Sequence, residues 1–267
     1  MKEYKIKPGQ NLVLRACATI PDKVSEEFKE ETRRLTTKLC LKLADLQDVL
    51  YAQHKHRLLV IFQGLDTSGK DGSIRNVFSN VSPEGLRVVA FKSPTQPELE
   101  HDYLWRVHDK VPGNGEIVVF NRSHYEEVLV VRVHSLMPEK IWRQRYRHIV
   151  EFERMLADEG TLVLKFFLHI GKDEQKKRLE TRLTQKNKNW KWDPSDLRDR
   201  EHWDEFLSAY EEAIVKTSTD ESPWYVVPAD KKWWRDYVVS ETLVEALEAL
   251  KMEYPRPKVD VSAIKID

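Results

Sequence analysis

The sequence predicts an α/β fold in which helices cover both faces of a five-stranded parallel sheet. Short, almost purely apolar runs alternate along the 267 residues with longer stretches of helical periodicity, a pattern typical of parallel sheets with crossover helices. The first of these apolar runs leads directly into a glycine-rich loop. No internal repeat or low-complexity linker interrupts the pattern, so we expect a single domain over residues 1–267.

The N-terminal part of the chain is predicted to lie outside the sheet. Residues 1–24 are polar and irregular, with turn signals at Pro8-Gly9 and Pro21-Asp22. A helical extension is predicted over residues 25–53, where leucines recur at spacings of three and four. We expect this helix to pack on the core or on a second subunit.

A phosphate-binding loop is predicted directly after the first strand. Residues 58–62 are an unbroken apolar run, and residues 64–70 then fit the spacing G-x-x-x-x-G-K. Glycines let backbone N–H groups turn toward an anion, Lys70 adds charge, and a helix predicted over residues 73–80 offers its N-terminus. The alternative is a glycine-rich turn that binds no ligand. The buried strand before it and the helix after it favour the phosphate-binding interpretation. Asp71 replaces the Ser or Thr that usually contributes a hydroxyl to magnesium.

Four further strands and six further helices complete the predicted fold. The strands are residues 87–91, 116–120, 161–168 and 224–227. The helices are residues 97–110, 125–133, 138–159, a helix starting near 172, 201–216 and 231–250, and a loose tail follows. Because ligands bind at the carboxyl ends of parallel strands, the polar side chains that follow each strand are candidate site residues.

Charged side chains follow several of these strands. Lys92 follows the second strand, and Asn121 and Arg122 follow the third. An acidic residue normally holds magnesium after that strand, so the neutral Asn121 makes Asp66 in the loop the better metal candidate. Arg122 can bind phosphate oxygens through two N–H groups. Further acidic candidates are Asp71, Glu126 and Glu127.

The region after the fourth strand is predicted to carry phosphate clamps and a lid. Arg178 and Arg182 lie one turn apart on a predicted helix, where both could bind phosphate. The alternative is that they belong to a solvated helix face, but the nearby phosphate loop favours a phosphate-binding role. Residues 186–200 interleave lysines with Trp190 and Trp192. The aspartates that follow favour a mobile lid over a nucleic-acid stripe. Asp102 and Arg106 have the spacing of a surface ion pair, and His124 and His169 are interpreted as structural or surface residues.

The composition excludes several functional classes. The formal net charge is zero, which argues against a general nucleic-acid binder. Cys17 and Cys40 have no metal-ligand or redox spacing, which indicates a reducing compartment. No run approaches the about 20 apolar residues that a membrane span needs. We therefore expect a soluble, cytoplasmic protein with no membrane and no nucleic-acid partner.

These motifs together resemble the polyphosphate kinase 2 family. The motifs that carry the resemblance are GLDTSGKDG at 64–72, DYLWRVH at 102–108, FNRSHYEEVLVVRV at 120–133, RHIVEFERML at 147–156, KFFLHIGKDEQKKRL at 165–179 and WKWDPSDLRDR at 190–200. The resemblance as a whole covers residues 30–250 approximately. Asn121, where other branches carry Asp, and Glu126 resemble the branch that phosphorylates both nucleoside mono- and diphosphates.

The resemblance implies a fold, an activity and a set of site residues. The fold would be a three-layer α/β/α sandwich of the thymidylate-kinase-like P-loop kinases, with a helical lid near residues 178–200. The enzyme would move phosphoryl groups reversibly between inorganic polyphosphate and AMP, ADP or ATP, with guanine nucleotides as further substrates. Its catalytic residues would be Asp66, Lys70, Arg122 and Arg178. Phosphate or nucleotide would contact Gly64, Gly69, Lys70, Asp71, Lys92, Arg106, Asn121, Arg122, Glu126, Arg132, Arg178, Arg182 and Lys188.

The resemblance also implies a metal: Asp66, Asn121 and Glu126 would organise Mg²⁺, with Mn²⁺ as a substitute. The long N-terminal helix and the aromatic residues Trp224, Trp233 and Trp234 indicate a homo-oligomer, either a dimer or a tetramer, with burial in the core as the alternative. Two alternatives stay open at this point: an ATP-dependent nucleoside monophosphate kinase, and a nucleotide-binding module without turnover.

Overall fold

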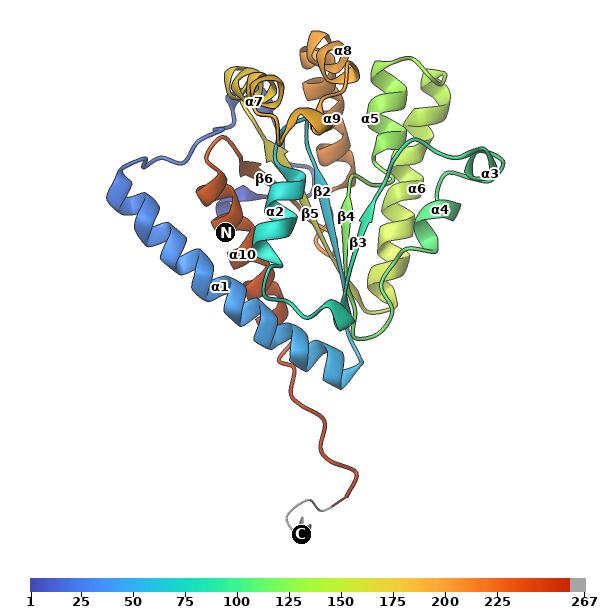
Figure 1. Cartoon of the computed structure of the whole chain (residues 1–267). Helices are drawn as coiled ribbons and strands as arrows, with labels where there is room; N and C mark the ends of the chain where they lie inside the picture. Colours follow the sequence, from blue (N-terminus) through green and yellow to red (C-terminus); the bar gives the residue numbers. More distant parts are fainter. Residues whose placement is uncertain (260–267) are drawn as a thin grey trace.

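One mixed sheet of six strands runs through the protein, whose computed structural model describes residues 1–259 (Figure 1). The strand order is β1-β6-β5-β2-β4-β3, and β2 to β6 are parallel. The strands are β1 (Lys5–Ile6), β2 (Arg57–Gln63), β3 (Leu86–Ala90), β4 (Ile117–Asn121), β5 (Thr161–His169) and β6 (Trp224–Pro228). The predicted α/β fold with a five-stranded parallel sheet is confirmed, and β2, which leads into the phosphate loop, lies at its centre.

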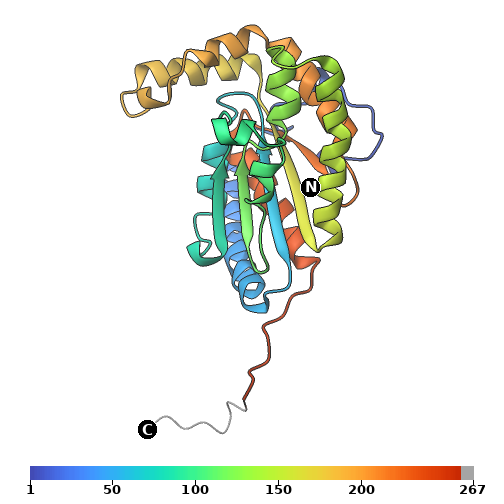
Figure 2. The same cartoon turned by 90° about the vertical axis from the view of Figure 1, so that its right-hand side faces the viewer.

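Helices cover both faces of the sheet, as predicted (Figure 2). One face packs against α1 (Glu26–Gln53), α2 (Lys70–Val77) and α10 (Lys232–Glu248). The other packs against α5 (Glu126–Val133), α6 (Glu139–Asp158) and α9 (Trp203–Thr217). Every side chain of β2 except that of Arg57 is buried, because helices lie on both sides of this strand.

Three parts of the chain differ from the sequence-based expectation. The single helix over residues 97–110 is wrong: the chain forms two short helices, α3 (Gln96–Leu99) and α4 (Trp105–His108). Between them the Asp102 carboxylate accepts a hydrogen bond from the backbone N–H of Leu104 at 2.9 Å, a local turn that competes with helix formation. Residues 1–24 contain β1, which pairs antiparallel with β6 and is too short for a readable pattern. α2 begins at Lys70, three residues earlier than predicted.

A helical segment projects past the carboxyl ends of the strands, at the upper left of Figure 2. It consists of α7 (Lys172–Thr184), the short 3-10 helix η4 (Asn189–Lys191) and α8 (Ser195–Glu201). This segment coincides with the predicted helical lid, and its closing motion stays a prediction. No helix among residues 1–259 has both the length and the apolar character needed to cross a membrane. The predicted loose tail ends in residues 260–267, which lie outside the described part of the chain.

Candidate active site

The loop between β2 and α2 has the conformation of a phosphate-binding loop. Gly64, Thr67 and Gly69 all have positive φ angles, of 152°, 64° and 106°. A side chain at either glycine is excluded: a Cβ on Gly64 would lie 2.8 Å from the Leu168 carbonyl oxygen, and one on Gly69 only 1.9 Å from an Arg235 nitrogen. The hydroxyls of Thr67 and Ser68 are buried without a hydrogen-bond partner among the described residues. The loop therefore has the bent backbone that a phosphate-binding loop requires, and its two hydroxyls are unpaired within residues 1–259 in this conformation.

Lys70 lies buried across the mouth of this loop. Its Nζ donates to the carbonyl oxygen of Gly64 at 2.6 Å and lies 3.4 Å from that of Leu65. Burial and the nearby Arg122 lower the pKa of Lys70 to about 8, while Asp66, Glu126 and Asp71 act in the opposite direction. A charged ammonium in this position is stabilised when a phosphate binds.

This pKa predicts that phosphate binding depends on pH. Below about pH 8 Lys70 is protonated in the free protein, and above it the charge is lost. We expect the affinity for tripolyphosphate, measured by calorimetry without metal, to fall as the pH rises through 8. Lys70→Arg keeps its charge across this range. Its affinity, although weaker, should not show the same decline; an identical pH profile in both proteins would contradict the assignment.

A narrow cavity opens between the loop and α9. Arg122, at the end of β4, donates to the Asp66 carboxylate at 2.8 Å. The negative charge of Glu126, and to a smaller extent that of Asp66, raises the pKa of Arg122, so its guanidinium stays protonated. Burial raises the pKa of Glu126 although Arg122 and Lys70 oppose this. The cavity, of about 30 Å³, is lined by Gly64, Leu65, Asp66, Arg122, Glu126, Val130, Asp199, Phe206 and Tyr210.

The projecting segment contributes two carboxylates that the sequence analysis did not assign to the site. Asp196 and Asp199 of α8 both have raised pKa values, first because they are partly buried and then because Asp66 repels them. His134 is hydrogen-bonded to Asp199 at 2.8 Å. The sequence signal was present, since both aspartates belong to the motif at 190–200, but spacing alone did not show which of its acids faces Asp66.

Asp71 and Asn121 bind each other and, through Asp71, the projecting segment. The Asn121 amide donates to one Asp71 oxygen at 2.7 Å, and Lys191 of η4 donates to the other at 2.9 Å. Burial alone would raise the pKa of Asp71, but these two bonds outweigh it and the net shift is downward. The residue that replaces the usual Ser or Thr thus connects the loop to the projecting segment.

The two lid arginines also have partners within the protein. The guanidinium of Arg178 donates to the carbonyl oxygens of Thr67, Ser68, Ala229 and Asp230 at 2.8–3.0 Å, and to Glu174. Arg182 donates to Asp196 at 2.6 Å and to the Lys191 carbonyl oxygen. In this conformation Arg178 holds the phosphate loop in place, and Arg182 holds α8 above it.

Comparison with known proteins identifies the family of this chain. The family model of polyphosphate kinase 2 matches residues 26–255. The chain belongs to the polyphosphate kinase 2 family. It is 51% identical, over all of both chains, to an AMP/ADP-polyphosphate phosphotransferase of Meiothermus ruber. It is 43% identical to an ADP-polyphosphate phosphotransferase of Rhodopseudomonas palustris, with 95% of this chain and 92% of the relative covered.

A solved structure of the family has the same fold. The crystal structure of polyphosphate kinase 2 from Arthrobacter aurescens superimposes with a TM-score of 0.93 at 38% identity, covering 98% of this chain and 93% of the other. The resemblance implied a three-layer α/β/α sandwich, and this likeness to a polyphosphate kinase 2 structure confirms that fold.

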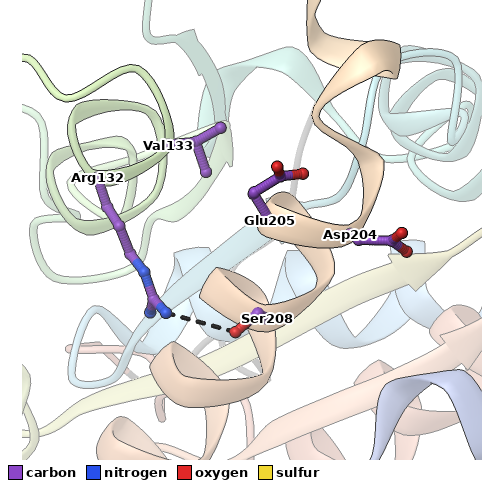
Figure 3. A pocket seen from close by; sticks show the side chains of 5 residues that line it. All are labelled: Arg132, Val133, Asp204, Glu205 and Ser208. Carbon is purple, nitrogen blue, oxygen red and sulfur yellow. Dashed lines mark hydrogen bonds between the residues drawn. The ribbon is translucent and has the colours of Figure 1, made fainter.

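Several residues that the family resemblance assigned to phosphate have other partners here. Arg106 pairs with Glu98 at 3.2 Å and donates to the Lys92 carbonyl oxygen, so the expected Asp102–Arg106 ion pair is wrong. Arg132 on α5 donates to Glu212 and Ser208 of α9. It lines a second cavity, of about 450 Å³, that shares no lining residue with the loop cavity (Figure 3). Lys188 lies on the projecting segment, just before η4.

The donor set around Asp66 suits magnesium only together with a phosphate ligand. Among residues 1–259 no three His, Cys, Asp or Glu side chains form a ready-made metal cluster. Asp66 nonetheless repels both Asp196 and Asp199, and a divalent cation would relieve that repulsion. Mg²⁺ is commonly held by one or two carboxylates, water and substrate phosphates, which fits this arrangement. The Asn121 amide nitrogen donates to Asp71, and Asn121 would coordinate a metal through its side-chain oxygen.

Proposed function

We propose that this protein transfers the terminal phosphoryl group of inorganic polyphosphate to AMP and ADP, and that the transfer is reversible. The observation that carries the proposal is the position of Lys70 at the loop, beside the Arg122–Asp66 pair. The phosphate loop supports a donor phosphate on one side and Arg122 an acceptor phosphate on the other. The name of the Meiothermus ruber relative supports both acceptors, and that of the Rhodopseudomonas palustris relative supports ADP.

Charge neutralisation and positioning supply the catalysis. A phosphate oxygen of AMP or ADP attacks the terminal phosphorus in line, and the bridging oxygen leaves with the shortened polyphosphate. Lys70, the N–H groups of the loop and Arg122 stabilise the charge on the transferred group. The acceptor is already an anion at neutral pH, so no general base is needed. Mg²⁺, for which Mn²⁺ would substitute, would bind phosphate oxygens beside Asp66, Asp196 and Asp199 and neutralise charge there.

The size of the loop cavity supports a lid that opens. About 30 Å³ holds roughly one water molecule and excludes a nucleotide. Two of its walls, Asp199 and Phe206, come from α8 and α9. We propose that α8 moves away to admit the nucleotide and returns to exclude water during transfer.

The test of this function is an assay without ATP. Purified protein is incubated with Mg²⁺, long-chain polyphosphate and AMP, and separately with ADP, and the products are separated by ion-exchange chromatography. We expect ADP and then ATP to form. Product from AMP with ATP as donor, but none with polyphosphate, would instead identify a nucleoside monophosphate kinase. Parallel reactions with GMP and GDP test guanine nucleotides.

The assembly and location of the protein are proposals of the same kind. Leu35, Leu41 and Tyr51 of α1 are each at least 40% exposed, which supports a homo-oligomer, a dimer or a tetramer, through this helix. Light scattering of the purified protein tests this directly. The free thiols of Cys17 and Cys40 support a reducing, cytoplasmic location.

A further inference from the structure

Arg235 of α10 is a buried cation that lies against the phosphate loop. Its side chain is 1% exposed. Its Nη1 lies 1.9 Å from the position that a Cβ on Gly69 would occupy, and its Nη2 lies 3.4 Å from the corresponding position on Gly72. The guanidinium therefore fills the space that the two glycines leave, at the point where the loop becomes α2.

Asp236, the next residue of α10, fixes this guanidinium and α2 together. Its Oδ1 accepts from Arg235 Nε at 2.8 Å and from the Ser73 hydroxyl at 2.8 Å, and its Oδ2 accepts from the Asn76 amide at 2.8 Å. Arg235 Nη2 lies 2.7 Å from Oδ1, yet its own N–H bonds point at no acceptor within the described residues. One carboxylate thus orients the arginine relative to the first two turns of α2.

The charges at this point favour an anion. The N-terminus of α2 carries partial positive charge, where an additional cation is unfavourable unless an anion is close. Arg178 also approaches Gly69, with its Nη1 3.5 Å from the same Cβ position. The Arg178 N–H groups are bonded to carbonyl oxygens and to Glu174, whereas Nη2 of Arg235 has no hydrogen-bond acceptor among the described residues although it lies close to the Asp236 carboxylate. Two guanidinium groups and a helix N-terminus thus meet at Gly69. Asp236 and Glu174 each pair with one of the two arginines, and a bound phosphate would add the negative charge that the helix N-terminus attracts.

We propose that Arg235 is a positioning residue for the phosphate bound at this loop. It holds the backbone from Gly69 to Gly72 in its phosphate-binding curve and maintains positive potential at the N-terminus of α2, so that the loop amides bind donor phosphate tightly. Asp236 keeps the guanidinium in place. This inference rests on the proposed function in one respect, namely that the bound phosphate belongs to polyphosphate.

The experiment measures phosphate binding separately from turnover. Tripolyphosphate is titrated by calorimetry, without metal or nucleotide, into the wild-type protein and into Arg235→Gln, Arg235→Lys and Val239→Ala. Val239 is a fully buried residue of the same helix, so its truncation destabilises α10 without removing a charge from the loop. We expect Arg235→Gln to bind at least about tenfold more weakly, Arg235→Lys to lie in between, and Val239→Ala to bind within twofold of wild type despite a lower Tm. Hydrogen exchange should accelerate at the amides of residues 69–73 in Arg235→Gln alone.

Each outcome decides the inference. Wild-type affinity in Arg235→Gln, or an equal loss in Val239→Ala, would overturn it, as would a wild-type protein that does not bind tripolyphosphate. If Arg235→Gln does not fold, Arg235→Lys still tests the role, because lysine keeps the charge but not the planar contact with Gly69 and the Nε–H bond to Asp236. A wild-type protein that binds tripolyphosphate but makes no ATP from polyphosphate and ADP would overturn the proposed function and leave this inference standing.

Discussion

Replacing Lys70 by methionine is expected to lower kcat/KM for ATP formation from polyphosphate and ADP by at least about 10²–10³-fold. Methionine keeps most of the buried stem but removes the only lysine ammonium bonded to the loop carbonyl oxygens among the described residues. Transition-state charge on the transferred phosphoryl group then loses its closest cation. The effect should appear in kcat as well as in KM, since the charge develops during transfer.

The control for this substitution is an exposed lysine on the projecting segment. Lys176→Met, on α7, removes a positive charge of the same size from the surface and should keep nearly full activity. Lys70→Met should also fold well, because it removes a buried charge whose desolvation already lowers its pKa. Near wild-type rates in Lys70→Met would show that the loop does not bind the reacting phosphate.

The parts of this site that the sequence predicted are those encoded by adjacent residues. The loop at 64–70 was predicted because a buried strand, a glycine spacing and a helix follow one another directly. Arg122 was predicted because it follows a parallel strand, and strand ends meet at one edge of the sheet. In both cases the local pattern and the tertiary position have the same physical cause.

The parts that the sequence did not predict depend on contacts between distant residues. Arg235 lies 166 positions from Gly69 in the chain, on a helix whose pattern indicates only that it packs on the sheet. Asp196 and Asp199 were recognised as charges of a lid, but only the return of α8 over the loop shows that they face Asp66. Arg178 was expected to bind phosphate, whereas its N–H groups hold loop carbonyl oxygens in this conformation. Spacing cannot distinguish these roles.

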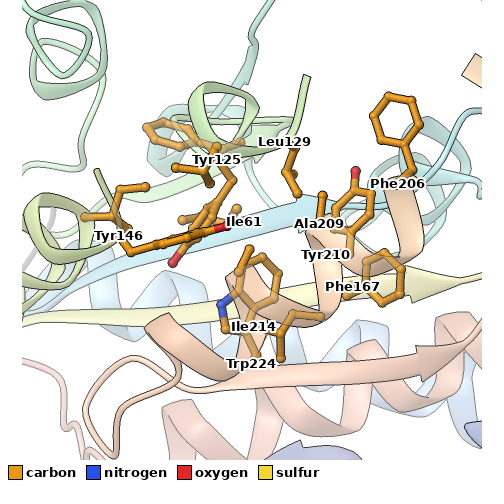
Figure 4. Close-up of a cluster of buried hydrophobic side chains, with 14 of the residues drawn as sticks. Ile61, Tyr125, Leu129, Tyr146, Phe167, Phe206, Ala209, Tyr210, Ile214 and Trp224 are labelled. Atoms are coloured by element: carbon orange, nitrogen blue, oxygen red, sulfur yellow. The ribbon is translucent and has the colours of Figure 1, made fainter. Parts of the chain in front are cut away.

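The second large effect is expected on stability, at the buried ion pair between Lys165 and Glu153. Lys165 on β5 is fully buried and bonded to Glu153 of α6, to the Tyr125 hydroxyl at 3.1 Å and to the Thr217 carbonyl oxygen at 2.8 Å. Figure 4 shows Tyr125 and Trp224 close together beside the sheet, with ring centroids 4.8 Å apart. Burial alone would raise the pKa of Glu153, but Lys165 and the hydrogen-bonded His124 outweigh it and lower the pKa overall.

Lys165→Met is expected to lower the free energy of unfolding at pH 7 by about 3–5 kcal/mol, because it leaves Glu153 as a buried charge without its partner. Urea unfolding followed by circular dichroism measures the loss. The matched variant is Lys165→Met with Glu153→Gln, which removes both charges and should recover most of the stability. Equal losses in the single and double variants would show that shape, not charge, is what Lys165 contributes.

The pH dependence of the single variant separates the two explanations further. Without Lys165 the pKa of Glu153 in the folded state should lie above its unfolded value, since burial then dominates. The folded protein consequently binds more protons than the unfolded one, and its stability falls as the pH rises through this range. Lys165→Met should therefore be closer to wild type at pH 5 than at pH 8, whereas the double variant, with no charge at either position, should differ from wild type by a similar amount at both. A cavity or a packing defect at Lys165 would give a loss that does not change with pH. Glu153 also accepts hydrogen bonds from His124 and Tyr125, which closely follow Arg122 in the chain. We therefore expect the loss of stability in Lys165→Met to extend to the part of the active site around Arg122.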